Sequence, residues 1–440
     1  MRALIKTASD NDALCLMLFV HAGSIYDPPR IRGIAHMLEH LMFTTKKNKS
    51  ESKLFEEMSK TGAQFNAYTS FDATVYFISG NSANWKALID IFYTIVMDEL
   101  DFSEEEYQRE MSVVLEERSM RSNDTIWQVL GMFLKGTDYD KDPAGTVESI
   151  KNITIADLKA YHAKYYKDSY MVACIPKNVE EEASAMISRR FGKSVDGCFE
   201  RPKLKRNLMQ IRGSEDKVTF VSADEGDILS KLGIKTDKNP ETNHFVNLFF
   251  ASVPYESTQV ALVDFWTHML AGLGGIMYKN LRQTYGYTYG VQCSNTSLLD
   301  VGYYQIQFQS VHKNLTEVMD VFCKDLLELR NEPIAKDHFK ASKQGFIEAR
   351  KYELNDSYNR CTQLGQAAFY DGLIFATAEE YVEFLDRVIT YEAVLEMGQE
   401  LFTFGNSKLI ISSSDPQDDE TKAHIVNKFM EIIVVKKEQE

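Results

Sequence analysis

The first half of the chain alternates apolar runs with amphipathic stretches, so it mixes strands and helices. A continuous apolar run predicts a buried strand, whereas apolar positions that recur every three or four residues predict a helix with one buried face. In chain order, these patterns predict a strand at 13–22, a helix at 31–43, a helix capped by Ser50 and ended by Gly62, a hairpin of strands at 63–69 and 73–79, an amphipathic helix at 85–96, a long helix at 103–121, helices at 124–135 and 154–166, and a strand at 170–175.

The second half repeats this mixture after a charged segment. Residues 193–242 carry only short apolar runs broken by proline and glycine, which indicates a connection between domains. In the strand expected at 300–310, apolar residues alternate with glutamines, which is typical of a strand with one buried and one wet face. Beyond the connection we expect strands at 244–254, 287–294, 300–310 and 407–413, a helix at 257–272, long helices through 313–402, and a terminal helix.

Two domains are expected, because a chain of 440 residues is too long for one ordinary core. We assign residues 1–200 to an N-terminal domain, 201–242 to a connecting segment and 243–440 to a C-terminal domain. Each half combines antiparallel strands with helices, so the fold class is α+β, with each sheet covered by helices on one side. This pattern suits a duplicated domain, although residue identity between the halves does not demonstrate one.

Charge and cysteine content argue against several classes of protein. The chain has 64 acidic and 49 basic residues and a formal charge of −15, which disfavours binding to nucleic acid or anionic membranes. Its six cysteines form no C-x-x-C pair and predict free thiols in a reducing compartment. No apolar run reaches the roughly 18 residues of a membrane span, and the first residues do not read as a secretory signal. A cytoplasmic location is therefore expected.

Two histidines and a glutamate on the helix expected at 31–43 give the strongest chemical signal. His36 and His40 are four residues apart, so both imidazoles project from one helix face, as two ligands of one zinc ion require. Glu39 reaches the same edge, where a carboxylate can accept a proton from a zinc-bound water. The order H-x-x-E-H is that of the inverzincin peptidases. We therefore expect Zn²⁺ as the cofactor and Glu39 as the catalytic base.

A catalytic zinc site also needs a third protein ligand, and the helix at 103–121 offers several carboxylates. Glu110 and Glu117 are seven residues apart and share one helix face, whereas Glu116 points about 100° away. One of the first two can bind the metal while the other supports a histidine. Spacing alone leaves open which of them binds, and also leaves open a purely solvated acidic face.

The segment 33–43, GIAHMLEHLMF, resembles the metal helix of the family that includes pitrilysin, insulin-degrading enzyme and the mitochondrial processing peptidase. In that family, a glutamate at the spacing of Glu117 from His40 completes the metal site, and a glutamate at the position of Glu110 assists. The resemblance thus implies that Glu117 is the third metal ligand and that Glu110 assists without binding the metal directly.

Further blocks extend this resemblance across most of the chain. The segment 62–77 resembles the family's hairpin, whose Asn-Ala strand edge pairs with the substrate backbone, which implies this role for Asn66 and Ala67. Upstream, HAGSIYDPP resembles the strand and turn before the metal helix, with Asp27 where glutamate is usual.

In the second half, the segment 270–291 resembles the family's glycine turn and the stretch that follows it. This resemblance implies that Arg282 and Tyr289 help to bind the substrate and polarise its carbonyl. The glycine turn departs from the family pattern, since it reads GLGG. Tyr287 lies close enough to Tyr289 to be mistaken for the functional tyrosine.

The resemblance implies a zinc-dependent metalloendopeptidase that hydrolyses peptides or unfolded polypeptide segments. Pitrilysin-like proteins enclose the peptide between two two-domain halves, and this chain has the length of one half. It nevertheless carries both the zinc residues and the Arg282–Tyr289 pair, which implies a homodimer, or a heterodimer with a related chain. The alternative is a non-catalytic structural or partner subunit of a larger assembly, although such subunits tend to lose the metal residues.

Overall fold

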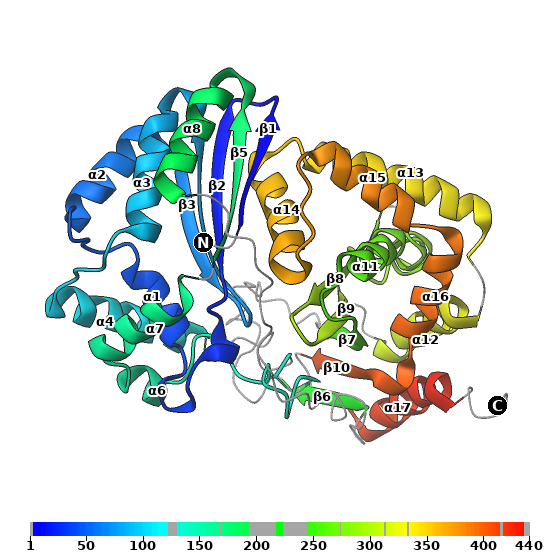
Figure 1. Ribbon diagram of the computed structural model, residues 1–440. Helices are drawn as coiled ribbons and strands as arrows, with labels where there is room; N and C mark the ends of the chain where they lie inside the picture. Colours follow the sequence, from blue (N-terminus) through cyan, green and yellow to red (C-terminus); the bar gives the residue numbers. More distant parts are fainter. Residues whose placement is uncertain are drawn as a thin grey trace. The chain divides into compact units, whose positions relative to one another are not determined.

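The computed structural model describes residues 3–121, 130–131, 133–167, 169–192, 217–222, 244–272, 274–311, 314–331, 334–413 and 417–434. The chain forms two compact units (Figure 1). The first unit comprises Met1–Ser122, Lys141–Lys203 and Glu348–Phe384, and the second comprises Asn123–Asp140, Leu204–Ile347 and Leu385–Glu440. Among the described residues, no helix is both long and apolar enough to cross a membrane.

The first unit is built on a five-stranded sheet with the order β1-β5-β2-β4-β3. The pair β1 and β5 is parallel, and the other neighbours are antiparallel. The strands are β1 (Ala3–Ser9), β2 (Ala13–Val20), β3 (Gln64–Thr69), β4 (Thr74–Asn81) and β5 (Ser169–Pro176). The helices are α1 (Ile34–Leu41), α2 (Glu51–Thr61), α3 (Trp85–Met97), α4 (Glu104–Arg121), α6 (Val147–Lys151), α7 (Ile155–Tyr165), α8 (Glu180–Phe191) and α14 (Ser357–Asp371).

Helices pack against both faces of this sheet, which differs from the expected one-sided cover. Leu14, Leu16 and Leu18 of β2 belong to the main apolar core with α1 and α3. The alternate residues of β2 face α14, where the ring of Phe19 lies 5.9 Å from that of Phe369, measured between centroids. The unbroken apolar run of β2 has this physical cause, since a strand buried on both faces needs apolar residues at every position.

The second unit repeats the strand order of the first. Its sheet has the order β6-β10-β7-β9-β8, which is the first order with five added to each number. Its parallel pair, β6 and β10, also corresponds to β1 and β5. The strands are β6 (Val218–Ser222), β7 (His244–Ser252), β8 (Val291–Ser297), β9 (Gly302–Ser310) and β10 (Ser407–Ser413). The helices are α11 (Ser257–Ala271), the π-helix η6 (Tyr278–Thr284), α12 (Leu315–Asn331), α16 (Tyr391–Leu401) and α17 (Asp419–Val434), while α13 (Lys336–Glu353) and α15 (Ala378–Val388) have residues in both units.

This common strand order shows the duplication that residue identity did not reveal. The wet face expected on β9 is also present, because Tyr304, Ile306 and Phe308 are buried while the alternating Gln305 and Gln307 are partly exposed. Their amide groups bond to neighbouring amides: Gln305 Nε2 donates to Asn247 Oδ1 at 3.0 Å and Gln307 Nε2 donates to Gln292 Oε1 at 2.6 Å.

Each unit contains a segment from the other half of the sequence. Residues Glu348–Phe384, which include α14, belong to the first unit, and residues Asn123–Asp140 belong to the second. In the second unit, the Phe133 ring stacks on Phe249 of β7, with centroids 5.3 Å apart. The compact units therefore do not follow the sequence ranges 1–200 and 243–440, because each unit includes a segment from the opposite half of the sequence.

Two strands and a helix type were not expected from the sequence. The edge strand β1 precedes the first predicted strand, and β6 lies inside the segment predicted to connect the domains. The rest of that connecting segment, and residues 122–129 of the helix predicted at 124–135, lie outside the described residues. The strand predicted at 287–294 begins only at Val291, after the π-helix η6 and a short turn.

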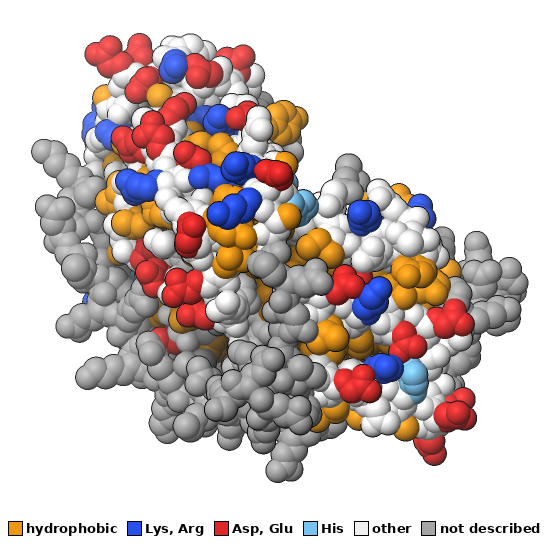
Figure 2. All heavy atoms as spheres, turned by 90° about the vertical axis from the view of Figure 1, so that its right-hand side faces the viewer, with side chains coloured by type: hydrophobic (Ala, Val, Ile, Leu, Met, Phe, Trp, Pro, Cys, Tyr) orange, Lys and Arg blue, Asp and Glu red, His pale blue; other side chains and the backbone are white. Residues whose placement is uncertain are grey.

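The molecular face drawn in Figure 2 carries mixed charges. Lys and Arg side chains lie among Asp and Glu side chains, with apolar side chains between them. Charge alone therefore does not single out a binding region on this face, and the candidate site has to be found from side-chain chemistry.

Candidate metal centre

Helix α1 carries the histidines, and a buried carboxyl group fixes where it begins. Gly33 precedes the helix with φ of +91°, a conformation that favours glycine, and a Cβ there would lie 2.6 Å from Ala144 O. The N–H of Gly33 donates to Asp27 Oδ2 at 2.7 Å, and the Tyr161 hydroxyl donates to Asp27 Oδ1 at 3.1 Å. The buried Asp27 carboxyl group thereby fixes the turn that precedes α1.

Helix α4 faces α1 with a stripe of carboxylates. Its residues Tyr107, Met111 and Val114 are buried at helical spacing. This packing turns Glu110 and Glu117 toward α1, where both lie within ion-pair distance of histidine nitrogens. Glu116, which helical spacing directs about 100° away from this pair, is exposed.

Three side chains converge as a possible metal site. Ligand atoms of His36, His40 and Glu117 all lie within 4.8 Å of one another. Glu117 Oε2 is 3.5 Å from His36 Nε2 and 3.4 Å from His40 Nε2. Four ligands at zinc bond lengths of about 2.0–2.1 Å form a tetrahedron whose edges are roughly 3.3 Å long. The spacing and the N/N/O donor set therefore fit zinc.

Glu110 lies on the opposite side of the His40 ring. Its Oε2 is 3.6 Å from His40 Nδ1, while Nε2 of the same ring faces Glu117. Although burial opposes protonation, the hydrogen bonds that the His40 ring donates to the carboxylates of Glu110 and Glu117 raise the pKa of His40 to about 9. A carboxylate at Nδ1 keeps the proton on that nitrogen and leaves Nε2 as the donor atom for a metal.

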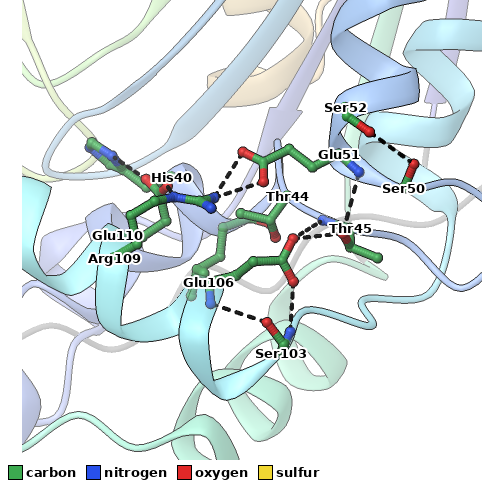
Figure 3. Close-up of polar contacts among 11 residues, drawn as sticks. His40, Thr44, Thr45, Ser50, Glu51, Ser52, Ser103, Glu106, Arg109 and Glu110 are labelled. Atoms are coloured by element: carbon green, nitrogen blue, oxygen red, sulfur yellow. Dashed lines mark hydrogen bonds and ion pairs between the residues drawn. The ribbon is translucent and has the colours of Figure 1, made fainter.

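Glu110 is held in turn by an arginine that links two helices (Figure 3). Arg109 Nε donates to Glu110 Oε1 at 3.1 Å. The same guanidinium donates to both carboxylate oxygens of Glu51, in the first turn of α2, at 2.8 Å each. A polar chain thus runs from α2 through α4 to His40 on α1.

Glu39 has a polar partner on the neighbouring sheet. The side chain is buried, with 9% of its surface exposed, and its Oε2 accepts a hydrogen bond from Thr69 Oγ1 at 2.7 Å. Thr69 ends β3, the edge strand that also carries Asn66 and Ala67. On this edge, Asn66 is exposed and its Oδ1 accepts from the N–H of Ala67 at 2.8 Å.

Arg282 and Tyr289 lie in the second unit and contact each other. The guanidinium carbon of Arg282 is 5.6 Å from the centroid of the Tyr289 ring, and Tyr289 is 90% exposed. Tyr287 is less exposed and stacks on Tyr285, with ring centroids 5.4 Å apart. Arg282 belongs to the π-helix η6, which a hydrogen bond from Asn280 Nδ2 to Asp325 Oδ1 ties to α12 at 2.7 Å.

The residues that the sequence analysis missed are the supporting ones. Thr69 lies inside the hairpin block that resembles the family, but nothing in the sequence indicates which hydroxyl meets Glu39. Arg109 and Glu51 are far apart in the chain and read as ordinary surface charges, so only the folded structure shows that their side chains meet.

The chain is similar to known peptidases along most of its length. A family model described as Insulinase (Peptidase family M16) matches residues 2–148, and one described as Peptidase M16 inactive domain matches residues 152–346. An uncharacterized zinc protease of Mycobacterium tuberculosis is 23% identical over 355 residues, which cover 80% of this chain and 77% of the relative. The mitochondrial-processing peptidase subunit beta of Mus musculus is 30% identical over 230 residues, or 49% of this chain and 46% of that subunit.

Solved structures share the fold. A protease from Helicobacter pylori aligns with a TM-score of 0.73 at 18% identity, covering 94% of this chain and 96% of that one. The periplasmic protease PqqL from Escherichia coli aligns with a TM-score of 0.72 at 18% identity, covering 98% of this chain and 48% of that one. Since the two family models together match most of the sequence and these neighbours share its fold, the chain belongs to peptidase family M16.

Proposed function

We propose that this chain is a zinc-dependent metalloendopeptidase. The observation that carries the proposal is the convergence of His36, His40 and Glu117 ligand atoms within 4.8 Å of one another, one residue away from a buried glutamate. A non-catalytic structural subunit has no use for this set. The zinc proteases among its relatives support the same conclusion at the level of the family.

His36, His40 and Glu117 would hold the zinc ion, with Glu110 behind His40. When bound there, zinc supplies a Lewis acid that polarises a carbonyl and lowers the pKa of a water molecule. Glu39 accepts the proton of the attacking water and returns it to the leaving amine, which a carboxylate one residue before His40 is placed to do.

The substrate class is a peptide or an unfolded polypeptide segment. An extended chain can add to the sheet at β3, because β3 is an edge strand and Asn66 is exposed on it. Main-chain hydrogen bonds of this kind are largely independent of sequence. The Oδ1 of Asn66 already accepts from the N–H of Ala67, so an added strand would compete with that side chain for this donor.

The partner is a second copy of this chain or a related chain. In this arrangement, Arg282 and Tyr289 of one copy bind the substrate beside His36, His40 and Glu117 of the other copy. The length of PqqL supports a pairing of two such chains. The alignment covers 98% of this chain but only 48% of PqqL, so this fold makes up about half of that longer chain. The described cysteines are free thiols, which favours the cytoplasm as the compartment.

Metal content and peptide hydrolysis test the enzyme proposal together. Purified protein is expected to hold one zinc per chain and to cleave unstructured peptides until a chelator removes the metal. His36→Ala, His40→Ala and Glu117→Ala should each lose stoichiometric zinc, whereas Glu39→Gln should keep zinc and lose nearly all turnover. Glu116→Ala is the matched control, because this exposed neighbour of Glu117 should retain both properties. A wild type without zinc, or a fully active Glu39→Gln, would reject the proposal.

A further inference from the structure

We propose that Thr69 is a positioning residue that holds the carboxylate of Glu39 in its working orientation. This inference rests on the proposed function, in which Glu39 is the base. Its basis is the hydrogen bond from Thr69 Oγ1 to Glu39 Oε2, 2.7 Å long, between the end of β3 and helix α1. A hydroxyl that donates to a carboxylate at this distance makes a charge-assisted bond, which is stronger than a bond between neutral groups.

The hydrogens available around Thr69 favour this assignment. Thr74 is the cross-strand partner of Thr69 on β4, and their hydroxyl oxygens are 3.4 Å apart. The fully buried Thr74 hydroxyl donates its single hydrogen to the carbonyl oxygen of Ala22. Thr74 can therefore only accept from Thr69, and it is a neutral acceptor at a long distance. The carboxylate at 2.7 Å is the better acceptor, so the Thr69 hydrogen goes to Glu39.

The position of Thr69 in the sheet explains how this hydrogen bond can orient the Glu39 carboxylate. A glutamate side chain has three rotatable torsions, and fixing one carboxylate oxygen restricts them and sets the direction of the other oxygen. Threonine is stiff at χ1, and its strand is anchored to β4 over Gln64–Thr69, so the donor itself is fixed. The same strand carries Asn66 and Ala67. Strand β3 thus both orients the base, through Thr69, and carries the residues proposed to bind the substrate backbone. A peptide that adds to β3 is therefore held at a fixed position relative to Glu39.

Steady-state kinetics on three variants test the inference. Thr69→Val keeps the branched shape but removes the hydroxyl, and should lower kcat about 10- to 100-fold, with KM and zinc content unchanged. Thr69→Ser keeps the hydroxyl and should recover most of the rate. Ser70→Ala is the control for hairpin distortion, since the Ser70 hydroxyl contacts Ala73 in the turn, and it should leave kcat unchanged.

A double variant separates positioning from a general structural role. In the Glu39→Gln background, Thr69→Val should add no further loss to the residual rate, because its effect passes through the carboxylate. An unchanged kcat in Thr69→Val, a loss of zinc in that variant, or a further drop in the double variant would each overturn the inference while the proposed function stands. A wild type that lacks zinc and turnover would overturn both.

Discussion

Asp27 is a carboxyl group buried at the entrance to α1. Burial raises its pKa to about 7, although the N–H of Gly33 and the hydroxyl of Tyr161 both donate to it. The folded protein therefore holds this proton well above the pH at which the unfolded chain, with a pKa of 3.8, releases it. Between these two values the native state binds more protons, so the stability contributed by this group falls as pH rises.

Asp27→Asn should remove that part of the pH dependence. An asparagine keeps an oxygen for the Gly33 N–H but carries no charge, so the variant should become more stable than wild type as pH rises from 4 to 8. Denaturant unfolding at several pH values, at constant zinc, measures the difference. Parallel stability profiles for the two proteins would contradict the assignment.

Sequence spacing can place residues near one another when they lie on the same helix. His36, Glu39 and His40 lie on one helix, so their spacing alone brings them together. Glu117 came from the family resemblance, because helical spacing could not choose between it and Glu110. Thr69 could not be predicted as a contact of Glu39, since the pairing depends on how β3 packs against α1.

At the scale of elements, the chain from Glu51 through Arg109 to Glu110 joins α2, α4 and α1. Arg109→Gln should weaken zinc affinity, because Glu110 then loses its anchor and orients His40 less well. Outer partners of metal ligands usually contribute 10- to 100-fold in affinity. Arg109 is 47% exposed and acts one step further out, so a loss of about three- to tenfold is expected.

Competition with a fluorescent zinc chelator measures this affinity. Arg190→Gln is the matched control, since its guanidinium pairs with Asp90 on the surface and has no contact with the metal group. Equal affinities for wild type and Arg109→Gln would show that Glu110 is fixed without the arginine.

Helix α14 packs so closely on β2 that one of its residues has no room for a side chain. A Cβ on Gly365 would lie 2.1 Å from an atom of the Phe19 ring. Gly365→Ala should therefore destabilise the protein by about 1–3 kcal/mol in chemical denaturation. Adding Phe19→Leu should recover part of this loss, because the smaller side chain makes space. Additive losses in the double variant would mean that the two residues do not compete for the same volume.

The sequence predicted most elements to within a few residues, and the exceptions have a common cause. The strands β1 and β6 lie at sheet edges, and each is the parallel partner of a later strand, β5 or β10. Their positions are set by pairing with residues far along the chain, so local periodicity does not reveal them. The unbroken apolar run of β2 did carry the information that both faces are covered.

For the whole molecule, the proposed shared site makes a sharp prediction. Glu39→Gln and Tyr289→Phe should each be nearly inactive, because one lacks the base and the other the tyrosine hydroxyl. Mixing them should form heterodimers in which one site carries neither lesion, and activity should return. Tyr287→Phe is the matched control, which should stay active alone. A mixture that remains inactive despite demonstrated subunit exchange would place Tyr289 in its own chain's site or in none.

The exchange of segments between units was beyond the reach of sequence analysis. A boundary near residues 201–242 follows from composition, but composition does not report which sheet an amphipathic helix covers. Only the contacts of Phe19 with Phe369, and of Phe133 with Phe249, show that each half supplies a segment to the other unit.

This exchange of segments also affects when each unit can fold while the chain is being synthesised. His36, His40 and Glu117 have all been synthesised once Glu117 is added. The helix that packs on β2 and β5, α14, is complete only after Asp371 is added. Until then the nascent chain exposes Met17, Phe19 and the facing residues of β5 to water. Folding during synthesis therefore cannot finish one half before the next begins, and the growing chain is expected to depend on chaperones that shield apolar strands.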